Sequence, residues 1–188
     1  MWHAYHEVDD QTSARQERIC WSTDLAAFCF FYVWRGRDAS IPEADATLMN
    51  RCFAAVAVSE RTRRQCVYSA ALTASLFTPT PSNVSLEQCQ SLGAGAAAAD
   101  VPTAGDLERR RLACIAGVAF MHGQTERQSA AEAEPEAVLS SESIHLCSKL
   151  AHGTARAVCR ENALACATPG ACQSSANMWE LTASILDA

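Results

Sequence analysis

The sequence predicts an all-α fold of tandem antiparallel helical hairpins, stapled by local disulfides within one domain, residues 1–188. Only 7% of the residues are aromatic and alanine is abundant. Strands favour aromatic and β-branched residues, whereas helices favour alanine. Ten cysteines are spread along the chain instead of clustering. Several pairs of them lie symmetrically about a turn signal, as hairpins would require.

Four cysteine pairs each have their midpoint on a turn signal. The midpoints are Ser59, Val101-Pro102, Gly153 and Pro169, and the pairs are Cys52/Cys66, Cys89/Cys114, Cys147/Cys159 and Cys166/Cys172. In an antiparallel hairpin, residues equally far from the turn lie level on the two helices, where their Cα atoms approach the roughly 5.5 Å that a disulfide needs. The symmetry therefore predicts these four disulfides, although spacing alone leaves other pairings open.

The N-terminal segment, residues 1–40, contains the most apolar stretch of the chain, residues 25–34 (LAAFCFFYVW). If residues 14–34 form one helix, Cys20 and Cys29 face opposite sides of it at 100° per residue. The two cysteines would then pair elsewhere, or one of them would stay free.

Two interpretations of residues 25–34 stay open, because the stretch is apolar on every side. It is a buried central helix, or it is a surface that docks on a partner or on a membrane protein. A second contact surface is expected in the amphipathic C-terminal stretch 178–186 (MWELTASIL). The expected docking residues are the large side chains of these two stretches: Phe28, Phe30, Phe31, Tyr32, Trp34 and Trp179.

Turn signals divide the rest of the chain. Residues 41–122 are predicted to form two disulfide-stapled hairpins, with breaks at TPTPSN and DVPTAGD. Residues 123–143 are acidic and rich in alanine, and are predicted to be the longest exposed loop. Residues 144–188 are predicted to form a C-terminal stapled hairpin and a last helix.

A weak internal repeat accompanies the cysteines. Arginine stands three residues before the second cysteine of three pairs (Arg63, Arg111, Arg156), and an apolar residue stands three before the first (Met49, Leu86, Ile144). The unequal spacing sets the repeat apart from solenoid families, which hold a fixed period. The basic clusters at 61–64 and 109–111 are expected to be solvated faces with local ion pairs; anionic lipid or an acidic neighbouring subunit is the alternative.

Several function classes find no support in the sequence. The net charge of −6 argues against nucleic-acid binding, which normally requires a basic face. No Cys-x-x-Cys redox motif occurs, and the nearest zinc candidates (His145 with Cys147, His152 with Cys159, and HAYHE at residues 3–7) lack a partnering pair. No nucleophile elbow, phosphate loop or paired-carboxylate motif occurs either. We expect no catalytic residue, no metal and no cofactor, with a metal-binding or thiol-redox protein as an alternative.

The cysteines and the N-terminus point to different compartments. Disulfides form in oxidising compartments, but the first residues contain acids and no apolar stretch of the secretory type. Either a signal was removed, or the chain reaches an oxidising space without one, or the cysteines stay reduced or bind metal. No apolar run is long enough to cross a bilayer. Asn83-Val84-Ser85 would be a glycosylation acceptor if the chain were secreted.

A cysteine-closed helical hairpin without a cleavable signal resembles the coiled-coil-helix-coiled-coil-helix proteins of the mitochondrial intermembrane space. The twin Cys-x9-Cys signature of that family is absent here. The resemblance implies import without a presequence, oxidation on arrival, and service as an accessory subunit or assembly factor of a respiratory complex.

We therefore expect a non-catalytic structural subunit of a larger membrane-associated assembly, namely a mitochondrial respiratory-chain complex. Its partners would be protein subunits, with peripheral membrane contact as a further option. Its location would be the intermembrane space or the inner-membrane face. The alternative is a secreted or periplasmic helical repeat protein that acts as a binding module, in an extracellular or periplasmic location.

Overall fold

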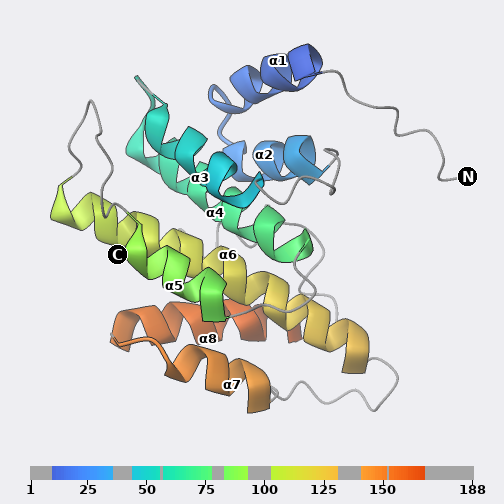
Figure 1. Ribbon diagram of the computed structural model, residues 1–188, viewed down its shortest axis with the longest axis vertical. Helices are drawn as coiled ribbons and strands as arrows, with labels where there is room; N and C mark the ends of the chain where they lie inside the picture. Colours follow the sequence, from blue (N-terminus) through green and yellow to red (C-terminus); the bar gives the residue numbers. More distant parts are fainter. Residues whose placement is uncertain are drawn as a thin grey trace, which may run out of the picture.

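The computed structural model describes residues 10–35, 44–55, 57–77, 83–92, 103–130, 141–151 and 153–167, and within these ranges the chain forms helices and no strands (Figure 1). The all-α fold predicted from composition is confirmed. In chain order the helices are α1 (Asp10–Cys20), α2 (Ala26–Arg35), α3 (Ala44–Ala54), α4 (Glu60–Phe77), α5 (Asn83–Ser91), α6 (Ala104–Ala130), α7 (Ser141–Ser148) and α8 (Gly153–Ala167).

Consecutive helices pair as hairpins, and a disulfide closes each pair near its turn. The α3–α4, α5–α6 and α7–α8 hairpins hold their bonded Cα atoms 5.5–5.6 Å apart, in the bonds Cys52–Cys66, Cys89–Cys114 and Cys147–Cys159. These three pairings confirm the prediction made from symmetry about a turn. Cys172 and the side chain of Cys166 lie outside the described residues, so the fourth pairing stays a prediction.

The first hairpin corrects the expectation for Cys20 and Cys29, which bond each other across a Cα separation of 5.3 Å. The single helix assumed over residues 14–34 does not form. The Ser22 hydroxyl donates to the Ile19 carbonyl at 2.9 Å, and the Leu25 amide donates to the Thr23 hydroxyl at 3.3 Å. Such side chains compete for backbone groups and favour helix ends, so α1 ends at Cys20 and α2 begins at Ala26.

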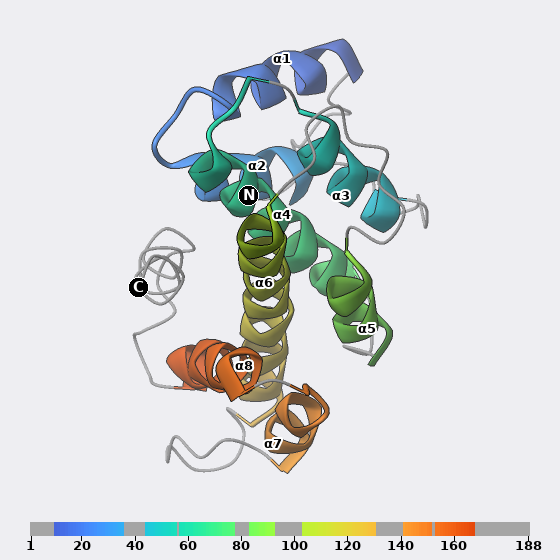
Figure 2. The same cartoon turned by 90° about the vertical axis from the view of Figure 1, so that its left-hand side faces the viewer.

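The second helices of the hairpins form a row, in which α2 packs on α4, α4 on α6 and α6 on α8. Figures 1 and 2 both show α4 and α6 between α2 and α8. The first helices α1, α3, α5 and α7 each lie against their own hairpin partner. Most of the buried side chains belong to this row, so it forms the core of the protein.

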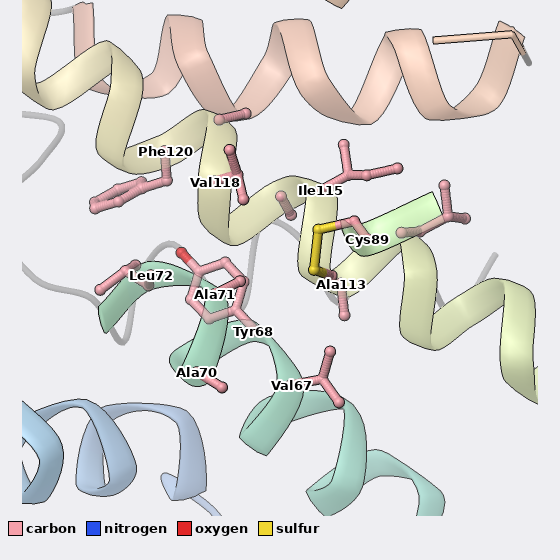
Figure 3. Close-up of a cluster of buried hydrophobic side chains, with 14 of the residues drawn as sticks. Val67, Tyr68, Ala70, Ala71, Leu72, Cys89, Ala113, Ile115, Val118 and Phe120 are labelled. Carbon is pink, nitrogen blue, oxygen red and sulfur yellow. A yellow bond between two sulfur atoms is a disulfide. The ribbon is translucent and has the colours of Figure 1, made fainter. Parts of the chain in front are cut away.

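Close approach of α4 and α6 depends on small residues. A Cβ atom at Gly117 would lie 2.5 Å from the Tyr68 carbonyl oxygen and 3.0 Å from the Ala71 Cβ, so only glycine fits there. Figure 3 shows the Tyr68 ring pointing from α4 toward α6. The ring is 1% exposed, and burial raises the pKa of its hydroxyl.

A second glycine sets the approach of α6 to α8. Helix α6 continues through Gly123 to Ala130, so the loop predicted over residues 123–143 does not begin at Gly123. A Cβ atom at Gly123 would collide with the carbonyl oxygen of Ala163 on α8. The glycine therefore marks a helix crossing inside the core, and α7 already begins at Ser141, within the predicted loop.

Candidate docking surface

The repeated arginine of the sequence has one structural role in three hairpins. Arg63 donates from Nη1 to the carbonyl oxygens of Cys52 and Phe53, each at 3.0 Å, at the end of α3. Arg111 donates from Nε and Nη2 to the Leu92 carbonyl, which follows α5, at 3.3 and 3.2 Å. The last carbonyls of a helix lack partners within it, and these guanidinium groups supply them.

The third arginine repeats the arrangement after α7. Arg156 donates from Nε to the Leu150 carbonyl at 2.6 Å and from Nη2 to the Ala151 carbonyl at 3.5 Å. Each arginine stands three residues, close to one helical turn, before the second cysteine of its hairpin. A covalent bond and a charged cap therefore hold the turn end of each of these three hairpins.

The apolar half of the repeat is less uniform. Leu86 is buried and Met49 is half-buried against the core, but Ile144 is 45% exposed. Burial of the residue three before the first cysteine is thus not shared by the three hairpins.

The basic clusters are solvated only in part, because Arg61 and Arg109 are exposed whereas Arg63, Arg64 and Arg110 are buried. The expected local ion pairs form between Arg63 and Glu60 and between Arg111 and Glu108. Arg110 forms a bidentate ion pair with Glu60, with N···O distances of 2.8 and 2.7 Å, and its guanidinium carbon lies 5.3 Å from the centre of the Phe53 ring. This contact joins α6 to the hairpin of α3 and α4. The paired charges explain how an arginine is accommodated in the interior.

One side of α2 belongs to the core. Phe30 and Trp34 are 0% and 1% exposed, their rings stack 4.9 Å apart, and Trp34 Nε1 donates to Glu17 Oε1 at 2.8 Å. The same carboxylate accepts from Arg51 of α3 at 2.8 Å, which links α1, α2 and α3. Phe30 and Trp34 were expected to dock a partner; that expectation is wrong, because both side chains pack inside the protein.

Polar groups of α4 fix the position of α2. The Ala27 amide donates to Gln65 Oε1 at 3.0 Å, and the Ser69 hydroxyl donates to the Ala27 carbonyl at 2.6 Å. Gln65 also donates from Nε2 to the Asp24 carbonyl at 3.4 Å. Gln65 and Ser69 are 2% and 0% exposed, and their two bonds to Ala27 are buried. Together with the Cys20–Cys29 bond they determine which side of α2 faces outward.

The outward side of α2 is apolar. Leu25 and Tyr32 are 54% and 53% exposed, and the half-buried Phe28 ring lies 4.3 Å from that of Tyr32. Phe31 is half-buried beside them, and Arg35 lies over its ring at 6.0 Å. Leu25, Phe28 and Tyr32 follow the spacing i, i+3, i+7 of one helix face. We name Leu25, Phe28, Phe31 and Tyr32 the α2 outer face.

The α2 outer face retains three of the residues expected to dock a partner, namely Phe28, Phe31 and Tyr32, and adds Leu25. Leu25 was not among the expected docking residues, which are all aromatic, although its spacing to Phe28 and Tyr32 is visible in the sequence. Trp179 and the rest of residues 178–186 lie outside the described residues, so their role as a second contact surface stays a prediction.

Among the described residues, no group of three or more His, Cys, Asp or Glu side chains could hold a metal ion. Cys147 and Cys159, two of the zinc candidates, are bonded to each other. No described helix is both long and apolar enough to span a bilayer. The four disulfides indicate an oxidising compartment outside the cytosol.

Comparison of the chain with protein-family models, with curated proteins and with solved structures gave no match. Function is therefore inferred from the α2 outer face and from the scaffold that holds it.

Proposed function

We propose that the protein is a non-catalytic, disulfide-rigidified helical scaffold, an accessory subunit that binds protein partners in a larger membrane-associated assembly. The observation that carries this proposal is the α2 outer face, an apolar surface on a helix that buried hydrogen bonds and a disulfide hold in place. Clustered exposed apolar side chains are typical of interaction sites. A surface fixed before binding loses little conformational entropy when its partner arrives.

The test compares tagged chains expressed in cells of the source organism, by native electrophoresis of gently solubilised extracts. We expect the wild-type chain to migrate in a complex much larger than 20.2 kDa. Tyr32→Glu places a charge on the α2 outer face and should release the chain from the complex. Leu164→Glu is the matched control, because Leu164 is an exposed apolar residue of α8, at 39%. A Tyr32→Glu chain that stays in the complex contradicts the proposal, as does a wild-type chain that migrates alone.

For the compartment we propose the mitochondrial intermembrane space or the outer side of the inner membrane, in a respiratory-chain complex. The proposal is supported by the disulfides and by the resemblance of the stapled hairpins to intermembrane-space proteins. Protease treatment of isolated mitochondria provides the test. The chain should resist protease in intact mitochondria and become sensitive once the outer membrane is ruptured. Recovery of the chain outside the mitochondrial fraction would contradict this assignment.

A further inference from the structure

In the described part of the chain, the row of second helices ends at α2 and at α8. Helix α4 has a row neighbour on each side, α2 and α6, and α6 likewise lies between α4 and α8. In the described part of the chain, α2 has α4 as its row neighbour and α1 as its hairpin partner. In stacked helical proteins the terminal units usually carry a polar outer face. The α2 outer face is apolar instead, with Leu25 and Tyr32 each more than half exposed.

The α2 outer face is complementary to itself when two copies run antiparallel. If the helices cross near Phe28, Leu25 of one copy lies beside Tyr32 of the other, because these residues are almost equally far from Phe28 in sequence. The two Phe28 rings then meet close to the twofold axis. Apolar side chains thus face each other along the whole contact, with Leu25 against Tyr32 at both ends and Phe28 against Phe28 at the centre, and the same surface of each copy is used, as in an isologous interface.

Charge at the two ends of α2 agrees with this direction. Asp24 precedes the helix and Arg35 ends it, and both are exposed. In an antiparallel pair, Asp24 of each copy lies within about one helical turn of Arg35 of the other, a gap that the long arginine side chain spans. A parallel pair would bring like charges together at both ends.

We infer that the α2 outer face binds the same face of a second copy of this chain, in an antiparallel, twofold-symmetric dimer that continues the row from one copy into the other. The inference rests on the proposed function, in which this face binds a protein. It identifies the first protein bound there as a second copy of this chain. The contact is about three helical turns long, so the dimer belongs among small interfaces, with a Kd on the order of 10 µM.

A lipid surface is the competing occupant. Anionic membranes attract clusters of lysine and arginine, whereas the α2 outer face is flanked by one anion, Asp24, and one cation, Arg35. The chain as a whole carries a net charge of −6. The charge pattern therefore favours a second copy, and vesicle binding is one outcome of the test.

The test is sedimentation velocity of the purified oxidised chain from about 1 to 300 µM, with two charge-reversal variants. Asp24→Arg places two cations at each end of the dimer and Arg35→Asp places two anions there, so each variant alone should dimerise about tenfold more weakly than wild type. A one-to-one mixture of the two variants restores opposite charges at both ends. The mixture should associate as tightly as wild type, because its heterodimer again pairs Arg with Asp.

Glu87→Arg on α5 and Arg160→Asp on α8 are the matched controls, since they make the same changes in net charge at exposed positions elsewhere. Both should dimerise like wild type. The inference is overturned by a chain that stays monomeric at every concentration, or by a mixture that associates no better than its components. A monomer that binds phosphatidylserine vesicles through Tyr32 also overturns it, in favour of a membrane contact.

The two proposals fail in different ways. A monomeric purified chain whose Tyr32→Glu variant still leaves the native complex refutes the dimer and keeps the docking function. The chain could also dimerise as expected for the charge-reversal variants and their mixture while its Tyr32→Glu variant stays in the native complex. That result refutes the docking of other subunits through this face.

Discussion

Replacing Gly117 by alanine tests how closely α4 and α6 approach. The added Cβ would lie 2.5 Å from the Tyr68 carbonyl oxygen and 3.1 Å from the Leu72 amide nitrogen. Both are backbone atoms of α4, so no side-chain rotation can relieve the contact. Ordinary contact begins near 3.4 Å, and the difference, 3.4 − 2.5, requires the helices to separate by about 0.9 Å.

The free energy of unfolding should fall by about 2 kcal/mol. Alanine is favoured over glycine inside a helix by about 1 kcal/mol, which opposes the effect. A separation of 0.5–1 Å forfeits about a quarter to a half of the dispersion energy of each affected contact, and overpacking typically costs about 1–3 kcal/mol. The clash at Gly117 involves backbone atoms, so we place its cost at or slightly above the upper end of that range, about 3 kcal/mol. Subtracting the gain of about 1 kcal/mol from alanine leaves the net loss of about 2 kcal/mol.

Gly105 provides the matched control, because it lies in the first turn of the same helix. A Cβ there would meet its nearest atom, Arg109 Nη2, at 3.6 Å, which is ordinary contact. Gly105→Ala should therefore stabilise the protein by about 0.5–1 kcal/mol. Urea unfolding with the disulfides intact, followed by circular dichroism, measures both variants. A Gly117→Ala chain as stable as Gly105→Ala would refute the close approach of α4 and α6.

Two further predictions concern the ends of helices. Arg156→Met removes the donor to the Leu150 carbonyl and should lower the free energy of unfolding by about 1 kcal/mol. Arg160→Met, at an exposed position of the same helix, should change it by less than about 0.5 kcal/mol. Equal losses in urea unfolding would contradict the capping role of Arg156. The hydrogen bond from Thr103, together with the nearby Arg109, lowers the pKa of Asp106. The ionised Asp106 carboxylate therefore stabilises the folded protein above the pKa that this group has in the unfolded chain. This stabilisation is lost as the pH falls through the pKa that it has in the folded protein. Stability should therefore decline less between pH 7 and pH 3 in Asp106→Asn than in wild type, and equal declines in thermal unfolding would contradict this assignment.

Much of the fold could be predicted because the geometry of three hairpins is visible in the sequence as cysteine pairs symmetric about a turn. Cys52 and Cys66 are symmetric about their turn, and a disulfide between level positions requires that symmetry. The repeated arginine was also visible, but its acceptors are backbone carbonyls, which carry no sequence signal. Its role as a cap is therefore visible only in the structure.

The errors arose where one residue type serves two structures. Gly123 was assigned to a loop because glycine is common there, but glycine also permits close helix crossings, and only the position of Ala163 distinguishes the two. On α2, an all-apolar sequence does not show which side is buried. Gln65 and Ser69 of α4 decide that by binding the backbone at Ala27, far away in sequence.

The positions of the cross-links favour a scaffold over a moving part. In the three arginine-capped hairpins, the disulfide and the cap both lie at the turn end, so each pair of helices is fixed at one end by bonds that are local in sequence. The opposite ends depend on packing within the row, where Gly117 and Gly123 bring backbones into contact. Opening α4 from α6, or α6 from α8, would expose apolar surface while the hairpins stay intact. Each hairpin should therefore be more stable than the packing between hairpins in the row. A partner that binds at α2 would meet a surface that is already formed.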